Sequence, residues 1–142
     1  MSTLFTKIID GAIPGRFVWK DPEVVVFLSI GPLTDGHALV VPREEVDEWT
    51  DAEPELLDKL LRVARTVGRA QKRAFSSQRA GLLVAGFEVP HLHVHVWPTA
   101  SLADFDLARA DANPDPARLD ANAEKLRAAL IEDGHAEFVP QG

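Results

Sequence analysis

The sequence predicts an α+β protein: a five-stranded antiparallel sheet with one long helix, a short N-terminal helix and a C-terminal helix. Five short runs rich in β-branched and other apolar residues predict the strands. Between the third and the fourth run, residues 51–74 show the apolar spacing of a long helix. The connections before this helix are too short for crossover helices, which favours antiparallel pairing of neighbouring strands.

The first part of the chain is expected to begin with a helical turn and to continue as strands. Residues 5–11 resemble one short helix that ends at a glycine. Three β-rich runs follow, at residues 16–20, 24–28 and 37–41. Asp21-Pro22 is typical of a turn, so the first two runs are expected to form a hairpin, and Pro42 is expected to stop the third.

The long helix has the strongest periodic signal in the chain. Its apolar residues recur at spacings of three and four: Leu56, Leu57, Leu60, Leu61, Ala64, Val67 and Ala70. Pro54 fits the first turn of this helix if Asp51 is the N-cap. Two further strands are expected after the helix, at residues 81–85 and 92–97.

The last part of the chain differs in composition from the rest. Residues 1–99 are expected to form one domain, and residues 100–142 an acidic extension that packs on this domain or on a second subunit. Within the extension, Asp115 followed by proline predicts a helix over residues 116–133, which Gly134 ends. The apolar stripe of this helix consists of Leu119, Ala123, Leu126 and Leu130.

Composition excludes several classes of protein. The 142 residues carry a formal net charge of −7, so the phosphates of duplex nucleic acid would repel the chain, and no nucleic-acid partner is expected. Cysteine is absent, which rules out disulfides and thiolate metal sites. No apolar run reaches the length of a signal peptide or a membrane helix. We therefore expect a cytoplasmic protein without a membrane partner.

Histidines are concentrated in one short segment. Three of the five histidines, His91, His93 and His95, alternate with apolar residues. On a strand these three imidazoles share one face, which is expected to look into solvent or a cleft. The other face carries Leu92, Val94 and Val96 and is expected to belong to the core.

Three interpretations of the histidine row compete. Surface histidines on an edge strand are the simplest. A zinc site could use two of them with His37 or Glu88 as a third ligand, but the outer pair on a strand would lie about 13 Å apart, which suits chelation poorly. Phosphoryl or nucleotidyl transfer is favoured, because a neutral imidazole is a good nucleophile and its neighbours disfavour protonation of His93.

Beyond the histidine row, several segments of the chain resemble the histidine triad nucleotide-binding family. His91 to Trp97 matches the family's signature of histidines alternating with apolar residues. Residues 5–14 resemble the family's N-terminal segment, and residues 36–42 resemble its G-H-x-L-V-x-P strand. The resemblance covers roughly residues 4–98. It implies a homodimer in which two five-stranded sheets join, and hydrolysis or transfer of nucleoside monophosphate groups from phosphoramidates, dinucleoside polyphosphates or nucleotide sugars.

The resemblance also implies roles for individual residues. His93 would be the nucleophile that forms a covalent phospho-histidine intermediate. His95 would contact the phosphate, His91 would fix the hydrogen-bond network, and His37 would complete the cluster from a neighbouring strand. The nucleotide would lie against Phe27, Ser29, Ile30 and Glu88, with Val18 and Ile8 as further walls of a base pocket. No cofactor and no bound metal are expected.

Several positions depart from the family pattern. Phe87 stands where glutamine is usual, Glu88 where serine or threonine is frequent, and Ser29 where aspartate often grips the ribose. Thr99 stands where a basic residue is common in some branches. Two alternatives to the enzyme therefore remain: a catalytically weakened module that binds or senses nucleotides, and a zinc hydrolase with histidine ligands.

Overall fold

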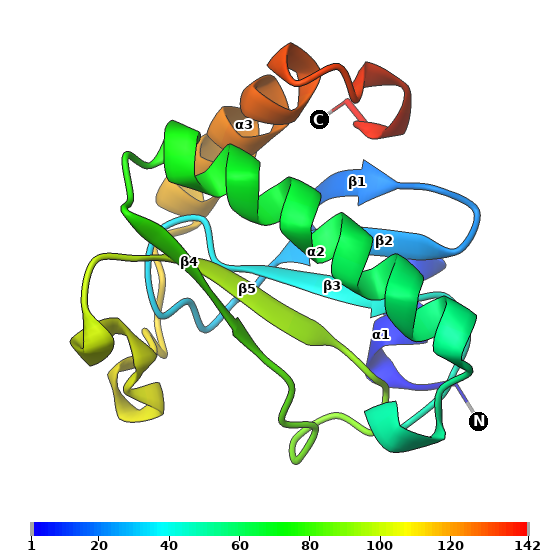
Figure 1. Ribbon diagram of the computed structural model, residues 1–142. Coiled ribbons are helices and arrows are strands. Elements are labelled where there is room, and N and C mark those ends of the chain that lie inside the picture. Colours follow the sequence, from blue (N-terminus) through cyan, green and yellow to red (C-terminus); the bar gives the residue numbers. More distant parts are fainter. Residues whose placement is uncertain (1, 142) are drawn as a thin grey trace.

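The computed structural model describes residues 2–141 and has an α+β architecture built on one antiparallel sheet (Figure 1). The strands are β1 (Phe17–Lys20), β2 (Val24–Leu28), β3 (Ala38–Pro42), β4 (Arg79–Leu83) and β5 (Val94–Thr99). Their order across the sheet is β1-β2-β3-β5-β4, and all neighbours pair antiparallel. The predicted fold class is confirmed.

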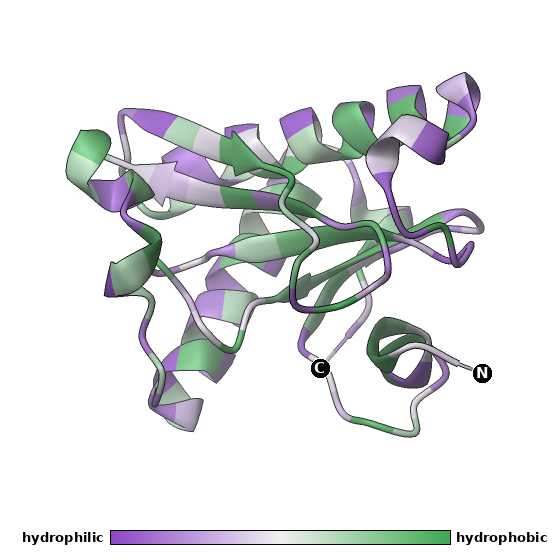
Figure 2. Ribbon diagram, turned by 90° about the horizontal axis from the view of Figure 1, so that it is seen from below, coloured by the Kyte–Doolittle hydropathy of each residue, from purple (hydrophilic) through white to green (hydrophobic). Residues whose placement is uncertain are grey.

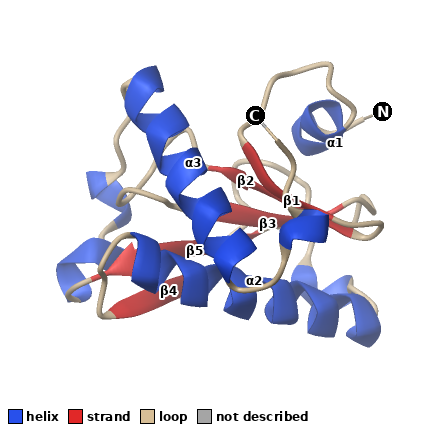
Figure 3. Ribbon diagram, turned by 90° about the horizontal axis from the view of Figure 1, so that it is seen from above, coloured by secondary structure: helices blue, strands red, loops and turns tan. Residues whose placement is uncertain are grey.

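Helices cover both faces of this sheet. They are α1 (Leu4–Ile9), α2 (Pro54–Ala74) and α3 (Pro116–Glu132). The short 3₁₀ turns of the described residues are η1 (Trp49–Asp51), η2 (Leu102–Phe105), η3 (Leu107–Arg109) and η4 (Ala136–Phe138). Figure 3 shows α2 and α1 on opposite sides of the sheet. The buried residues of α3 pack in the same core cluster as those of α2. Among residues 2–141, no helix combines the length and the apolar character that crossing a membrane requires.

Alternation along the central strands divides the core between these two faces. In β2, Val24 and Val26 pack in the larger cluster under α2 and α3, whereas Val25 and Phe27 pack in the smaller cluster against α1. Every residue of β2 and β3 is buried, because both faces of the sheet are covered. The central strands are accordingly hydrophobic along their length (Figure 2).

The long helix begins later than its sequence predicts. Its first residue is Pro54, and Glu53 occupies the N-cap position without a side-chain hydrogen bond. The prediction that Asp51 caps the helix is wrong: Asp51 lies in η1. The physical reason is that proline takes the first helical position, so the cap must be the residue directly before it.

The apolar stripe of α2 is covered within the same chain. Leu60, Val67 and Ala70 are buried in the larger core cluster with residues of the sheet and of α3. Leu61, predicted to belong to the stripe, is 46% exposed, whereas Val63 takes that place at 3% exposure because it lies between Leu60 and Val67 on one face. A second subunit is therefore not needed to cover this stripe.

Strands β4 and β5 are shifted relative to their predicted ranges. β4 begins at Arg79, and β5 begins at Val94 and continues to Thr99. Arg79 of β4 pairs with Thr99, and this pairing continues β5 beyond Trp97, through Pro98 to Thr99. The pairing of β3 with β5 ends at Val96, so Pro98 has a neighbouring strand on one side only, where a missing N–H is tolerated.

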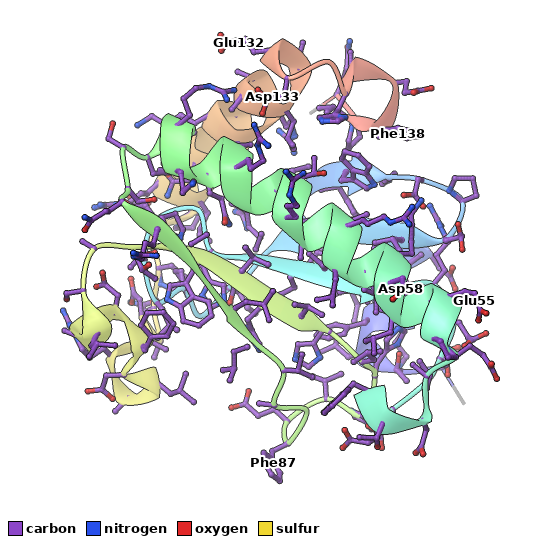
Figure 4. The ribbon with its side chains drawn as sticks, viewed as in Figure 1. Glu55, Asp58, Phe87, Glu132, Asp133 and Phe138 are labelled. Atoms are coloured by element: carbon purple, nitrogen blue, oxygen red, sulfur yellow. The ribbon has the colours of Figure 1, made fainter. Side chains whose placement is uncertain are left out.

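The C-terminal helix forms as its sequence predicts. The carboxylate of Asp115 accepts a hydrogen bond from the Ala117 N–H at 3.1 Å, and Gly134 follows the helix with φ +94°. The stripe residues Leu119, Ala123, Leu126 and Leu130 are all buried. Beyond the helix, the ring of Phe138 stacks on Trp19 of β1 with centroids 4.7 Å apart, at the position labelled in Figure 4.

Candidate active site

A cleft of about 570 Å³ opens on the face of the sheet that α1 covers. The first half of the chain contributes apolar side chains and His37 to its walls: Phe5, Ile8, Ile13, Phe27, Ile30, Leu33, His37 and Leu39. The other walls come from the end of β4, from the β4–β5 loop, from β5 and from the extension: Leu83, Phe87, Glu88, Val89, His93, His95, Leu107 and Ala110. Three imidazoles therefore line one cavity.

His95 is connected to His37 by a hydrogen-bonded chain that fixes the hydrogens of both rings. The backbone N–H of Leu33 donates to Nδ1 of His37 at 2.9 Å, so this nitrogen carries no hydrogen. The hydrogen of neutral His37 is then on Nε2, which donates to Nδ1 of His95 at 3.0 Å. Neutral His95 consequently carries its own hydrogen on Nε2. Trp97 supports the chain from the side, with its ring centroid 5.4 Å from that of His37.

The other cleft imidazole, His93, is held in the opposite tautomer. Its Nδ1 lies 2.7 Å from the carbonyl oxygen of His91 and must donate, because a carbonyl can only accept. Nε2 of neutral His93 therefore bears a lone pair. Phe5 packs edge-on against the ring at 4.8 Å, and the ring of His95 lies 4.9 Å away. The result is a basic nitrogen on His93 beside a ring whose free nitrogen donates.

Burial keeps these imidazoles neutral. It lowers the pKa of His37 to about 3, with repulsion from His95 acting in the same direction. Burial together with repulsion from His93 lowers the pKa of His95 to about 4. The pKa of His93 is also lowered, chiefly by burial. All three rings are thus available at neutral pH as hydrogen-bond donors or nucleophiles rather than as cations.

His91 does not share the cleft with the others. It precedes β5 and is fully buried, so the prediction of three imidazoles in a row on one exposed face is wrong for this residue. Its Nε2 donates to the Pro42 carbonyl at 2.7 Å, and its Nδ1 lies 2.6 Å from Oγ1 of Thr3. His37 instead supplies the third ring of the cleft. The apolar side of the segment behaves as predicted, since Leu92, Val94 and Val96 are all buried.

The residues predicted to contact a nucleotide lie on the same cleft. Phe27 forms part of its buried floor, while Ile30 is 76% exposed at its rim. Ser29 also lines the cleft, and its hydroxyl accepts a hydrogen bond from the Gly31 N–H at 3.1 Å. Glu88 lies at the exposed tip of the β4–β5 loop, together with Phe87, which projects from the molecule in Figure 4.

The sequence analysis assigned Val18 to the cleft wrongly and did not predict several other residues that form it. Val18 points to the opposite face of the sheet, where it is buried in the larger core cluster. Phe5 and the Leu33 N–H set the environment of His93 and His37, and Leu107 and Ala110 bring the extension into the cleft. No local pattern marks these residues, because each of them reaches the site through long-range packing.

Formal charge is sparse around the cleft. Of its lining residues within 2–141, those with a formally charged side chain are Arg16 and Glu88. Arg16 is engaged with Asp120 of α3, through Nε and Oδ1 at 2.7 Å. Across the described part of the chain, no cluster of three or more His, Cys, Asp or Glu side chains has the arrangement of a metal site.

A known protein family matches most of this chain. The family model of the HIT domain matches residues 10–102, which include all four histidines described above. This chain belongs to the HIT family. An uncharacterized HIT-like protein of Borreliella burgdorferi is 32% identical over 131 residues, which cover 87% of this chain and 90% of the relative.

Solved structures agree with the family assignment. A zinc-bound histidine triad family protein from Mycobacterium smegmatis has a TM-score of 0.80 at 27% identity, covering 96% of this chain and 98% of its own. A HIT family hydrolase from Legionella pneumophila has a TM-score of 0.62 at 28% identity, covering 71% of this chain and 96% of its own. The resemblance stated from the sequence is confirmed.

Proposed function

We propose that this HIT-family protein is a hydrolase or nucleotidyl transferase that acts at the α-phosphate of a nucleotide-like substrate through a covalent intermediate on His93. The observation that carries the proposal is the fixed tautomer of His93. Its Nδ1 is held by the His91 carbonyl, so the lone pair of Nε2 is available in a cleft where burial lowers the pKa of the ring. A neutral imidazole of this kind is a competent nucleophile.

The reaction would proceed in two displacements. Nε2 of His93 attacks the α-phosphorus, a P–N bond forms, and the bond from phosphorus to the leaving group breaks with its electron pair on the leaving group, which takes a proton from solvent. Water then attacks the same phosphorus, breaks the P–N bond and loses a proton. Nucleoside monophosphate leaves, and His93 returns to its starting tautomer.

His95 would stabilise charge on the phosphoryl oxygens. Because its Nδ1 is occupied by His37, its Nε2–H can donate to an oxygen of the phosphate. A donor that is already oriented before the reaction stabilises the developing charge without reorganisation. The apolar walls made by Ile8, Phe27 and Leu39 suit the nucleobase.

The charge of the cleft favours one leaving group over another. Arg16 is already paired with Asp120, and Glu88 adds a negative charge at the mouth. A dinucleoside polyphosphate would bring several negative charges to this site without cations to receive them. An amine leaving group would instead be attracted by Glu88. We therefore expect nucleoside phosphoramidates to be cleaved faster than dinucleoside polyphosphates.

The proposal includes a homodimer in the cytoplasm. Strand β4 is at the edge of the sheet and presents Leu82 at 51% exposure, while Leu61 on α2 is 46% exposed. Edge strands with exposed apolar residues are typical sites of pairing with a second copy. A stable two-fold interface would bury at least about 2,000 Å² in total. Light scattering at micromolar concentration should give twice the 15.6 kDa chain mass, and the chain mass itself would contradict the dimer.

Intact mass spectrometry after mixing with an adenosine phosphoramidate tests the chemistry. We expect a nucleotidyl adduct on the wild-type protein, none on His93→Ala, and a loss of turnover by about 10³-fold or more in that variant. His135→Ala is the matched control, because this histidine lies outside the cleft residues. Full turnover by His93→Ala would refute the assignment.

A panel of substrates separates the alternatives. Tight nucleotide binding by calorimetry, without turnover of any phosphoramidate, dinucleotide or nucleotide sugar, would identify a binding module instead of an enzyme. Stoichiometric zinc by elemental analysis, with activity lost to a chelator, would identify a metal-dependent hydrolase and overturn the proposed mechanism.

A further inference from the structure

The loop at residues 31–36 connects β2 to β3 beside the candidate site, and the C-terminal extension holds it. Asp35 in this loop receives a two-point contact from Arg118 of α3: Nε to Oδ1 at 2.9 Å and Nη2 to Oδ2 at 2.5 Å. Asn122, one turn further along the same helix, donates to Oδ1 of Asp35 at 3.1 Å. The backbone N–H of Asp111 donates to the Pro32 carbonyl at 3.0 Å.

These contacts surround the donor that sets the tautomer of His37. Leu33, whose N–H donates to Nδ1 of His37, lies between Pro32 and Asp35. Residues 31–35 are only partly buried, so apolar packing does little to fix their backbone. Within the body of the protein, the loop is anchored by the Thr34 hydroxyl, which donates to the Pro98 carbonyl at 2.7 Å, and by the Gln71 amide, which donates to the Gly36 carbonyl at 2.8 Å.

We propose that Arg118 and Asn122 are positioning residues for the active site: by holding Asp35 they keep the Leu33 N–H on Nδ1 of His37. The chain of contacts then continues from Nε2 of His37 to Nδ1 of His95. A two-point contact between a guanidinium and a carboxylate fixes direction as well as distance, which a single contact does not. The extension is in this way part of the catalytic apparatus without touching the reacting atoms.

We call the contacts of Arg118 and Asn122 with Asp35 the clamp. Loss of the clamp would change which nitrogen of His37 carries the hydrogen. Without the Leu33 donor, Nδ1 of His37 is free to carry the hydrogen, and Nε2 then becomes an acceptor toward His95. His95 would have to donate through Nδ1, and its Nε2 could no longer donate into the cleft. The side chains of Arg118 and Asp35 are 67% and 40% exposed, so this pair adds little to global stability and its effect falls on geometry.

Arg118→Gln tests the clamp in the full-length protein, with Arg73→Gln as the matched control. Arg73 also makes an ion pair, with Asp133 at the end of α3 at 2.8 Å, but it contacts neither the loop nor the cleft. Nitrogen-15 NMR of the imidazole rings at neutral pH reports the tautomers of His37 and His95. For Arg118→Gln we expect mixed tautomer signals, a kcat lower by about 10- to 100-fold, little change in KM, and an unchanged melting temperature.

Two further variants complete the experiment. Arg118→Lys keeps the charge but not the two-point contact, and we expect an intermediate kcat; Asn122→Ala should show the same tautomer change to a smaller extent. The expected change in kcat rests on the proposed function, whereas the NMR signals of the rings do not. Failure of the His93 chemistry can therefore be distinguished from failure of the clamp. Wild-type ring signals in Arg118→Gln, or the same change in Arg73→Gln, would overturn the inference.

Discussion

Acid should destabilise this protein through the buried, neutral ring of His37. The pKa of His37 is about 3 in the folded protein, because the ring is buried, and 6.5 is its ordinary value. A group whose pKa is lowered by folding leaves stability intact above its unfolded pKa and costs stability as pH falls below it, because only the unfolded chain binds the proton. The loss therefore begins near pH 6.5 and continues toward pH 3.

The magnitude follows from the distance between the pH and the unfolded pKa. pH 5 is 1.5 units below 6.5, the ordinary pKa that His37 has in the unfolded chain. Each unit corresponds to about 1.4 kcal/mol, so His37 alone should lower the free energy of unfolding by about 2 kcal/mol between pH 7 and pH 5. His95, with a pKa of about 4, acts in the same direction over this range, although its partly exposed ring makes the effect smaller.

Urea denaturation at pH 7, 6 and 5 measures this dependence. The free energy of unfolding of the wild-type protein should fall by about 2 kcal/mol more than that of His37→Gln, in which an amide still donates to Nδ1 of His95. Effects of overall charge are shared by the two proteins and cancel in the difference. Parallel curves for both proteins over this pH range would show that His37 is not buried in its neutral form.

Substitutions of Gln71 and Gly36, which lie where the 31–36 loop enters β3 beside His37, should also change the free energy of unfolding. Gln71 is fully buried, and its amide donates to the carbonyls of Gly36 and Val96, so Gln71→Leu should lower the free energy of unfolding by about 2 kcal/mol in urea titrations; an unchanged midpoint would contradict this. Gly36 has φ +88°, and an added Cβ would overlap the ring of Phe75. Gly36→Ala should therefore cost about 3 kcal/mol, whereas Gly11→Ala, with φ +86° in open space, should cost about 1–2 kcal/mol. Equal losses would show that the ring moves aside.

Local patterns predicted the elements of the fold because they record which side of an element is buried. The alternation in β5 correctly assigned Val94 and Val96 to the core and His93 and His95 to the other face. Asp115 and Gly134 marked the ends of α3, since capping depends on a few neighbouring residues. The same reasoning failed for Asp51, where the helix start depended on the position of a proline.

The antiparallel sheet, the order of elements along the chain and the two histidines on one strand face all follow from the sequence. Two contacts could not be predicted from it: His91 bonds to Thr3, which is 88 positions away, instead of lining the cleft, and Asp35 is held by Arg118, 83 positions away. Periodicity describes the neighbourhood of a residue along one helix or strand. The tautomers of the site depend instead on donors and acceptors from distant segments, and folding alone brings these together.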